Sequence, residues 1–301
     1  MSFNGVSVAV PTFMLADRAV NWSAFEKYID WLCGDKVDGV VPCGTTGGFL
    51  CLSADEQRRL IEICVEVCGK RAKVIAGAAA ATTPETINLV KSAEKAGANA
   101  ALIVSPFYVK PSQEGIYQFY KDIHDATNIP IVIYSNPGRA GVGIAIDTVK
   151  RLMELPRIVG LKDSTSDLSR TLEISSFMKR GFSLLCGEDS LFLPFLSCGG
   201  TGIISVTAGV APMQFKEIWK CWNDKDIDKA HKTAISVRKL CAAMFMSPSP
   251  IPVKYALYMM GFAEPHTRLP LGPISCECKS IIKEELASLG LCNSCLNKKC
   301  C

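Results

Sequence analysis

Lys162 follows directly on a short apolar run, residues 158–161, and a polar segment comes after it. The run lies between two stretches of helical periodicity and therefore predicts a buried parallel strand that ends at this lysine. An ordinary lysine titrates at about 10.4, so only about one in 2,500 is a neutral amine at pH 7. Burial disfavours the ammonium form and leaves an amine that can attack a carbonyl carbon. On this segment alone, a lysine that simply reaches solvent is an equally supported alternative.

Two further segments offer groups that can hold a carboxylate. Thr45 and Thr46 lie in a Gly-Thr-Thr-Gly turn after another predicted strand, where closely spaced N–H groups and hydroxyls can cradle an anion. Arg139 follows a Pro-Gly turn, and its planar guanidinium can bind a carboxylate with two hydrogen bonds. A purely structural turn and a surface arginine are the simpler alternatives when each segment is taken by itself.

Proton transfer would depend on phenols and hydroxyls, since histidine is missing from the predicted strand ends. Tyr108 and Tyr134 follow the fourth and fifth predicted strands, although both could instead be packing aromatics. The three histidines fall on helices or loops away from these ends, and no metal-ligand pattern is present among the ends. A Schiff-base mechanism needs no metal, because the iminium is itself the electron sink.

Strand-like and helix-like segments alternate over the first 223 residues. The predicted strands are residues 6–13, 39–43, 73–78, 100–105, 129–134, 158–162, 182–186 and 201–206. The helices that follow them are residues 22–33, 53–68, 83–96, 112–126, 146–154, 167–178, 191–197 and 212–222. Eight such pairs predict a (β/α)8 TIM barrel with its active site at the carboxyl ends of the strands. An open doubly wound sheet is the alternative, but no Gly-x-Gly-x-x-Gly turn follows the first strand.

The rest of the chain divides into two parts. Residues 224–291 contain only amphipathic helical patterns, at 226–245, 252–260 and 275–289, and predict a helical appendage packed on the barrel. Residues 292–301 are short, polar and rich in cysteine, and we expect them to be poorly ordered. Their Cys292-x-x-Cys295 and Cys300-Cys301 spacings could bind zinc or form disulfides between chains, but incidental thiols are the simpler interpretation.

Composition indicates a globular cytoplasmic protein. Of 301 residues, 49% are hydrophobic and 21% charged, and the net charge of +4 comes from scattered basic residues, which gives no case for nucleic acid or a membrane surface. The sequence has no apolar run of membrane-spanning length and no basic segment typical of a signal peptide at its start. Most of the fifteen cysteines lie within apolar elements, as expected of buried free thiols.

Several motifs recur together in one known family. They are Gly-Thr-Thr-Gly at residues 44–47, Ser-Pro-Phe-Tyr at 105–108, Pro-Ser-Gln-Glu-Gly at 111–115, Tyr134 with Asn-Pro-Gly-Arg at 136–139, Gly-Leu-Lys-Asp at 160–163 and Pro-Ile-Pro-Val-Lys at 250–254. In this order and spacing the chain resembles the dihydrodipicolinate synthase / N-acetylneuraminate lyase family of class I aldolase-type barrels. The resemblance covers about residues 5 to 289.

The resemblance implies condensation of pyruvate with L-aspartate 4-semialdehyde to give 4-hydroxy-tetrahydrodipicolinate, in lysine and diaminopimelate biosynthesis. It implies a pyruvate imine on Lys162 with no separate cofactor, and Tyr134 as proton donor and acceptor. Thr45 and Tyr108 would complete a proton relay, Tyr108 being supplied by a neighbouring subunit of a homotetramer built as a dimer of dimers.

The resemblance also implies how the substrates are held. Thr46 and the backbone of Ile204 would bind the pyruvate carboxylate, Arg139 would bind the carboxylate of the aldehyde, and Gly187 would line the substrate site. A sugar-acid lyase needs neutral hydroxyl-binding groups where Arg139 stands, so an N-acetylneuraminate lyase or a 2-keto-3-deoxy-sugar-acid aldolase is the less favoured alternative. A non-catalytic binding protein on the same barrel is a further alternative.

The chain departs from the family pattern at a few positions. Gly48 replaces a usual Glu, Ser135 replaces a usual Asn, and Ala140 replaces a common Thr, which affects the pocket for the second substrate. Many members are inhibited by lysine at a dimer-interface site that has polar or aromatic ligands. Ala54, Gln57, Ala81 and Phe107 occupy those positions here, while Glu85 remains, so we expect weak or absent lysine feedback.

Overall fold

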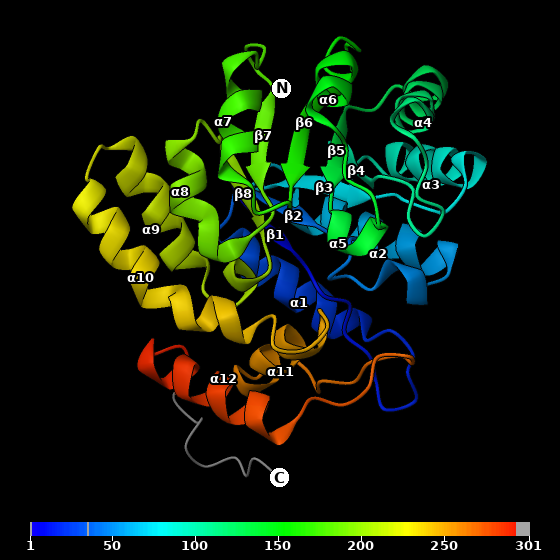
Figure 1. Cartoon of the computed structure of the whole chain (residues 1–301). Coiled ribbons are helices and arrows are strands. Elements are labelled where there is room, and N and C mark those ends of the chain that lie inside the picture. The colour runs from blue at the N-terminus through cyan, green and yellow to red at the C-terminus, as the bar shows by residue number, and fades with distance from the viewer. Residues whose placement is uncertain (1, 35, 293–301) are drawn as a thin grey trace.

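The described strands close into a parallel barrel in the order β1 to β8, with β8 pairing back onto β1 (Figure 1). The computed structural model describes residues 2–34 and 36–292. The strands are β1 (Gly5–Ala9), β2 (Gly39–Val41), β3 (Lys73–Gly77), β4 (Ala100–Val104), β5 (Ile131–Ser135), β6 (Ile158–Asp163), β7 (Ser183–Cys186) and β8 (Gly202–Ser205). The predicted (β/α)8 barrel is confirmed.

Helices connect consecutive strands and surround the barrel (Figure 1). They are α1 (Trp22–Cys33), α2 (Ala54–Cys68), α3 (Thr83–Lys95), α4 (Gln113–Ala126), α5 (Pro137–Ala140), α6 (Ile146–Leu152), α7 (Leu168–Ser176), α8 (Phe192–Ser197) and α9 (Pro212–Asn223). Three short 3-10 turns also occur, η1 (Phe49–Cys51), η2 (Asp189–Leu191) and η3 (Thr207–Gly209). The short helix α5 has no counterpart among the predicted elements.

Local sequence signals fix several of these helix starts. Ser53 caps α2 by accepting a hydrogen bond from the Glu56 backbone N–H, and the Glu56 side chain accepts from the Ser53 backbone in return. Asn136 caps α5 with Pro137 at its first position. The predicted strand over residues 6–13 is too long, because β1 ends at Ala9 and Pro11 has no N–H to continue the ladder.

Apolar side chains fill both faces of the barrel wall, as the near-continuous apolar strands predict. The barrel interior is packed by buried side chains that include Val41, Ile75, Leu102, Val132 and Leu185. A larger cluster fills the layer between strands and helices. The interior is therefore a packed core, and open space is confined to its end.

Within the described residues, three helices follow the barrel, α10 (Ile227–Ala243), α11 (Ile251–Met259) and α12 (Cys276–Ser288). The arrows of β5 and β6 point towards the end of the barrel where α11 and α12 lie (Figure 1). The connection from α10 to α11 thus passes near the carboxyl ends of the strands. Cys295, Cys300 and Cys301, on which the zinc and disulfide alternatives depend, lie outside the described residues.

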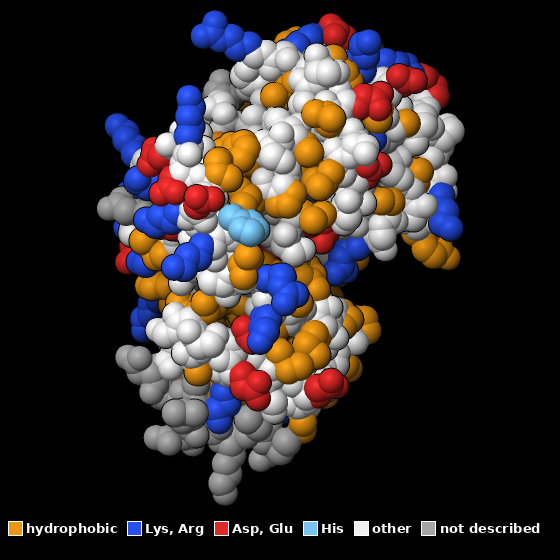
Figure 2. Space-filling model, turned by 60° about the vertical axis from the view of Figure 1, so that its left-hand side comes forward, with side chains coloured by type: hydrophobic (Ala, Val, Ile, Leu, Met, Phe, Trp, Pro, Cys, Tyr) orange, Lys and Arg blue, Asp and Glu red, His pale blue; other side chains and the backbone are white. Residues whose placement is uncertain are grey.

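Basic and acidic side chains are interspersed over the face shown in Figure 2. Within residues 2–34 and 36–292, no helix combines the length and the apolar character needed to cross a membrane. The same residues contain no cluster of three or more histidine, cysteine or acidic side chains placed to hold a metal ion.

Candidate active site

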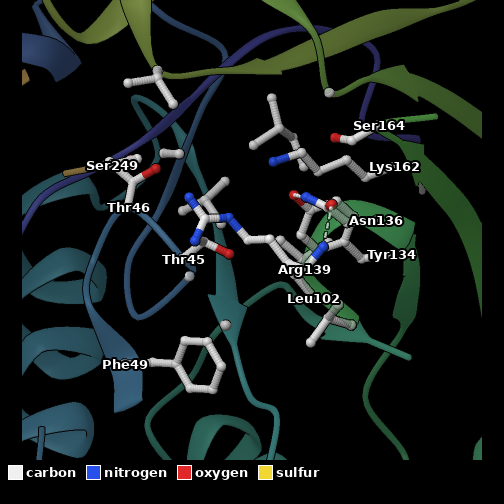
Figure 3. A pocket seen from close by; sticks show the side chains of 18 of the residues that line it. Thr45, Thr46, Phe49, Leu102, Tyr134, Asn136, Arg139, Lys162, Ser164 and Ser249 are labelled. Atoms are coloured by element: carbon white, nitrogen blue, oxygen red, sulfur yellow. Dashed lines mark hydrogen bonds between the residues drawn. The ribbon is translucent and has the colours of Figure 1, made fainter. Parts of the chain in front are cut away.

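A cavity of about 60 Å³ opens at the carboxyl ends of the strands. Seven of the eight predicted site residues line it, namely Thr45, Thr46, Tyr134, Arg139, Lys162, Gly187 and Ile204. Figure 3 shows Lys162 and Tyr134 on one side of this cavity and Thr45 and Thr46 on the other. The barrel therefore gathers groups that are separated by up to about 160 residues in the sequence.

Lys162 is only 7% exposed and occupies the second-last position of β6. It pairs in register with Tyr134 of β5, and its Nζ lies 4.4 Å from the centroid of the Tyr134 ring. The side chain does not extend into bulk solvent. Of the two interpretations of this lysine, a buried amine and a side chain that reaches solvent, the structure confirms the first. Its amine faces the cavity, where a carbonyl compound can reach it.

The environment of Tyr134 favours loss of its phenolic proton. Burial raises the pKa of Tyr134, but the positive charge of Lys162 and the neighbouring Ser164 and Asn136 side chains more than offset this, with a contribution from Arg139. The net pKa of Tyr134 is below the usual tyrosine value. Asn136 Nδ2 donates a hydrogen bond of 2.8 Å to the phenolic oxygen. Tyr134 is therefore suited to exchange a proton within the cavity.

The turn that carries Thr45 and Thr46 is tightly constrained. The Thr12 hydroxyl donates a 2.8 Å hydrogen bond to the Gly47 carbonyl and so holds the turn against the end of β1. A Cβ at Gly47 would lie 2.8 Å from the Cys43 backbone nitrogen, so any larger residue would force the turn open. Thr46 is buried and lines the cavity.

Arg139 is positioned by the short helix α5. Asn136 Oδ1 accepts a hydrogen bond from the Arg139 backbone N–H, and Gly141 ends the helix in a left-handed conformation with φ of 78°. The Arg139 side chain lines the cavity and extends from α5 across it, so that its guanidinium lies towards Thr45 (Figure 3). Asn136 therefore contacts the Tyr134 phenol with one end of its amide and caps the short helix that carries Arg139 with the other.

The ends of β7 and β8 complete the cavity wall. A Cβ at Gly187, just after β7, would lie 1.9 Å from Ser164 Oγ, just after β6, so only glycine allows the ends of β6 and β7 to approach this closely. Asp189 accepts hydrogen bonds from the Thr207 N–H at 2.6 Å and from the Thr207 hydroxyl at 2.5 Å, which anchors the chain just after Ile204. The backbone of Ile204 is thereby held at the cavity.

A buried ion pair fixes the end of β6. Arg170 Nε donates to Asp163 Oδ2 at 2.7 Å, and both side chains are at least nine-tenths buried. The other carboxylate oxygen of Asp163 accepts from the Thr165 N–H and hydroxyl. Because breaking a buried pair leaves an uncompensated charge, this network restrains the backbone directly after Lys162.

Tyr108 is the one predicted site residue that does not line the cavity of its own chain. It is 91% exposed and has a φ of 73°, which is uncommon for a residue other than glycine. A fully exposed phenol held in a left-handed turn contributes nothing to the cavity of this chain. The resemblance assigns it to a neighbouring subunit.

Sequence reasoning missed several residues that line the cavity. Asn136 and Ser164 stand two positions after Tyr134 and Lys162, and Glu188 directly follows Gly187. Burial raises the pKa of Glu188, with a further increase from Asp189, so this carboxyl group holds its proton more strongly than usual. Each of these polar residues stands within two positions of a predicted strand end, and this is the sequence signal that could have identified them.

Phe245 and Ser249 also line the cavity, although they belong to the connection between α10 and α11. Ser249 is buried and lies on the side of Thr46 in Figure 3. The appendage therefore closes one wall of the site. No local sequence signal could have placed them there, because only the tertiary packing brings residues 245–249 over the strand ends.

Fold, cavity and relatives together define a class of protein: a (β/α)8 lyase barrel in which a buried lysine lines the cavity at the carboxyl ends of the strands. Within that class the chain belongs to the dihydrodipicolinate synthetase family, whose model matches residues 2–289.

Individual relatives agree over nearly the whole chain. The 4-hydroxy-tetrahydrodipicolinate synthase of Thermodesulfovibrio yellowstonii is 43% identical over 96% of this chain and 99% of its own length. The crystal structure of dihydrodipicolinate synthase from Aquifex aeolicus has a TM-score of 0.93 at 36% identity, covering 96% of this chain and 99% of that one. The enzyme from Acinetobacter baumannii, solved in complex with pyruvate, has a TM-score of 0.93 at 37% identity, covering 96% and 100%.

Proposed function

We propose that the protein condenses pyruvate with L-aspartate 4-semialdehyde to give 4-hydroxy-tetrahydrodipicolinate, through an imine on Lys162. The observation that carries this proposal is the buried Lys162 amine, which faces a cavity that also contains a tyrosine of lowered pKa and two separate groups for anions. Relatives that are about 40% identical over nearly the whole chain bear the name of this activity.

The proposed reaction begins with attack of the Lys162 amine on the ketone carbon of pyruvate. Loss of water gives the iminium, and loss of a methyl proton gives the enamine, with Tyr134 as the group that accepts and returns protons. The enamine carbon then forms a bond to the aldehyde carbon, and the resulting alkoxide takes a proton. Finally the amino group of the bound aldehyde attacks the imine carbon, which closes the ring and releases the Lys162 amine.

Both substrates carry carboxylates, so two anion sites are needed. Thr46 with the backbone of Ile204 would hold the pyruvate carboxylate, and Gly187 would line the substrate site. Arg139, whose side chain lines the cavity, would hold the carboxylate of the aldehyde, which enters second. A charged guanidinium at this position favours a small acidic aldehyde over a sugar acid, whose hydroxyls need neutral partners.

The proton relay would extend beyond one chain. Thr45 lines the cavity, whereas Tyr108 is exposed and does not line it. We therefore propose that Tyr108 enters the cavity of a second copy, in a homotetramer arranged as a dimer of dimers. Light scattering of the purified protein, combined with the activity of Tyr108→Phe, tests this arrangement. A fully active monomer would contradict it.

Borohydride reduction in the presence of pyruvate tests the proposed imine. We expect a permanent pyruvyl adduct on Lys162, located by peptide mass spectrometry. Lys254 provides an internal control, because it is the other buried lysine among the described residues and its pKa is lowered to about 7, mainly by burial. Its Nζ donates to the His266 carbonyl at 2.7 Å, away from the cavity. An adduct on Lys254 or no adduct at all would favour a non-catalytic binding protein.

Arg139→Gln should weaken recognition of the aldehyde but not of pyruvate. Loss of a charge-assisted bidentate contact predicts an increase of about 100-fold in KM for L-aspartate 4-semialdehyde. The rate of borohydride trapping with pyruvate should stay unchanged, and Arg139→Lys should give an intermediate effect because it keeps the charge without the fork. Unchanged KM, or cleavage of N-acetylneuraminate by the unmodified protein, would instead favour the sugar-acid lyase alternative.

Lysine should inhibit the protein weakly or not at all. Ala54, Gln57, Ala81, Glu85 and Phe107 line one groove of about 520 Å³ on the described surface. Gln57 is buried, with its amide nitrogen donating to the carbonyls of Phe49 and Leu52, so it is not free to bind an amino acid. Steady-state rates at increasing L-lysine check this expectation. Strong submillimolar inhibition would contradict it.

A further inference from the structure

Two buried cysteines meet at the ends of α1 and α2. Cys33 is the last residue of α1 and Cys68 is the last residue of α2, and their Sγ atoms are 3.1 Å apart. Both residues are about 1% exposed. A disulfide requires a separation of about 2.05 Å, so a movement of about 1 Å would join the two sulfur atoms. The packing of the two helices therefore holds this pair close to bonding distance.

An arginine lies across both helix ends. Arg71 Nη2 donates to Asp30 Oδ1 on α1 at 2.8 Å and to the Val67 carbonyl on α2 at 2.6 Å. The carboxyl ends of helices disfavour a thiolate, but a nearby guanidinium favours it. The hydrogen bond with Cys68 and the charge of Arg71 lower the pKa of Cys33 although burial opposes them, whereas the pKa of Cys68 is raised. Cys33 is thus the better nucleophile of the two.

The pair lies at the opposite end of the barrel from the active site. β2 begins at Gly39 and β3 begins at Lys73, shortly after the two cysteines, whereas the cavity lies at the other ends of these strands. A surface groove of about 560 Å³ between α1 and α2 is lined by Asp30, Val67 and Arg71, the neighbours of the pair. A small molecule that entered this groove would reach the sulfur atoms after a slight opening of either helix end.

We propose that Cys33 and Cys68 form a redox-active dithiol that is oxidised to an intramolecular disulfide by a low-molecular-weight disulfide such as oxidised glutathione. The Cys33 thiolate attacks one sulfur of the small disulfide, which forms a mixed disulfide and expels one small thiolate. The Cys68 sulfur, after losing its proton, attacks the Cys33 sulfur and expels the second small thiolate. Two protein thiols are oxidised, one small disulfide is reduced to two thiols, and the two protons pass to those thiols.

The disulfide should stabilise the barrel without altering catalysis. It would link residues 35 positions apart and so restrict the unfolded chain, which predicts an increase of about 5 °C in the midpoint of thermal unfolding. The rate of condensation should remain the same in both redox states, because the bond forms at the end of the barrel away from the cavity. The inference is independent of the proposed function.

Peptide mapping tests the proposal on the full chain. The protein is incubated with an excess of oxidised over reduced glutathione, its remaining thiols are alkylated, and tryptic peptides are analysed without reduction. We expect most chains to contain peptide 28–36 joined to peptide 60–70, with fragmentation placing the bond on Cys68. Free Cys33 and Cys68, glutathione adducts alone, or a bond from Cys33 to Cys64 would overturn the proposal.

Three variants provide matched controls. Cys64→Ala removes a neighbouring buried thiol of the same helix and should keep both the cross-link and the thermal shift. Cys33→Ala and Cys68→Ala should lose both. A thermal shift that persists in either of these two variants would show that oxidation elsewhere causes it. If these two variants fail to fold, the mapping of the unmodified chain decides the matter alone.

Discussion

Replacing Lys162 by arginine should reduce turnover on the order of 10⁴-fold or more. Arginine keeps a positive charge at the end of β6, but its guanidinium remains protonated at all relevant pH values and cannot condense with a ketone. The positive charge next to Tyr134 would persist in this variant. The loss of turnover would therefore result from the missing nucleophile and not from a change in local electrostatics. Steady-state kinetics with both substrates measure the effect, and borohydride trapping should give no adduct. Unchanged turnover would rule out the proposed mechanism.

A second buried lysine allows a matched control for this result. Lys254→Met removes an amine that is also buried and has a lowered pKa, while keeping an unbranched side chain of similar length. Its lost hydrogen bond to the His266 carbonyl affects stability, and circular dichroism would report that change. Lys254→Met should keep its turnover, and borohydride should still trap pyruvate on Lys162 in this variant. Equal loss of activity in both variants would indicate a general effect of disturbing a buried lysine.

The sequence predicts the barrel well because its signals are local and repeated. Each parallel strand is a short apolar run, and each helix has its own cap or periodicity, such as the capping box at Ser53. Most of the candidate site residues follow from the same reasoning, since every barrel strand directs its carboxyl end to one face, whereas Ile204 is a candidate only through the family resemblance. Lys162, Tyr134 and Arg139 are found together for that reason.

The missed features depend on contacts that no local pattern encodes. The sequence places Asn136 in a loop, but its simultaneous contacts with Tyr134 and the Arg139 backbone exist only because α5 folds the loop back on the strand end. Ser249 reaches the cavity across more than 200 residues from Thr46. The first strand was predicted too long because an apolar run continues beyond the point where Pro11 interrupts the ladder.

The role of Asn136 leads to a pH prediction. Its Nδ2 donates to the phenolic oxygen of Tyr134 and so favours the phenolate, which is one reason why the pKa of Tyr134 is lowered. Asn136→Asp keeps the Oδ1 that caps α5 but replaces the donor with a carboxylate, so the pKa of Tyr134 should rise. The phenol of Tyr134 then stays protonated up to a higher pH. The alkaline limb of the plot of kcat against pH should therefore shift to higher pH. A limb that shifts to lower pH or stays at the same pH would contradict the role given to the Asn136 hydrogen bond.

Tyr134→Phe should lower kcat by about 10² to 10⁴-fold, the range for loss of a positioned acid or base. The phenyl ring keeps the packing against Lys162, so the fold and the buried amine are retained. Lys162 should still be trapped by borohydride after long incubation with pyruvate, because the amine itself is intact, but the adduct should form more slowly. The alkaline limb that Asn136→Asp displaces should be absent from this variant, since the titrating phenol is gone. If the limb persists in Tyr134→Phe, a group other than the Tyr134 phenol carries that proton.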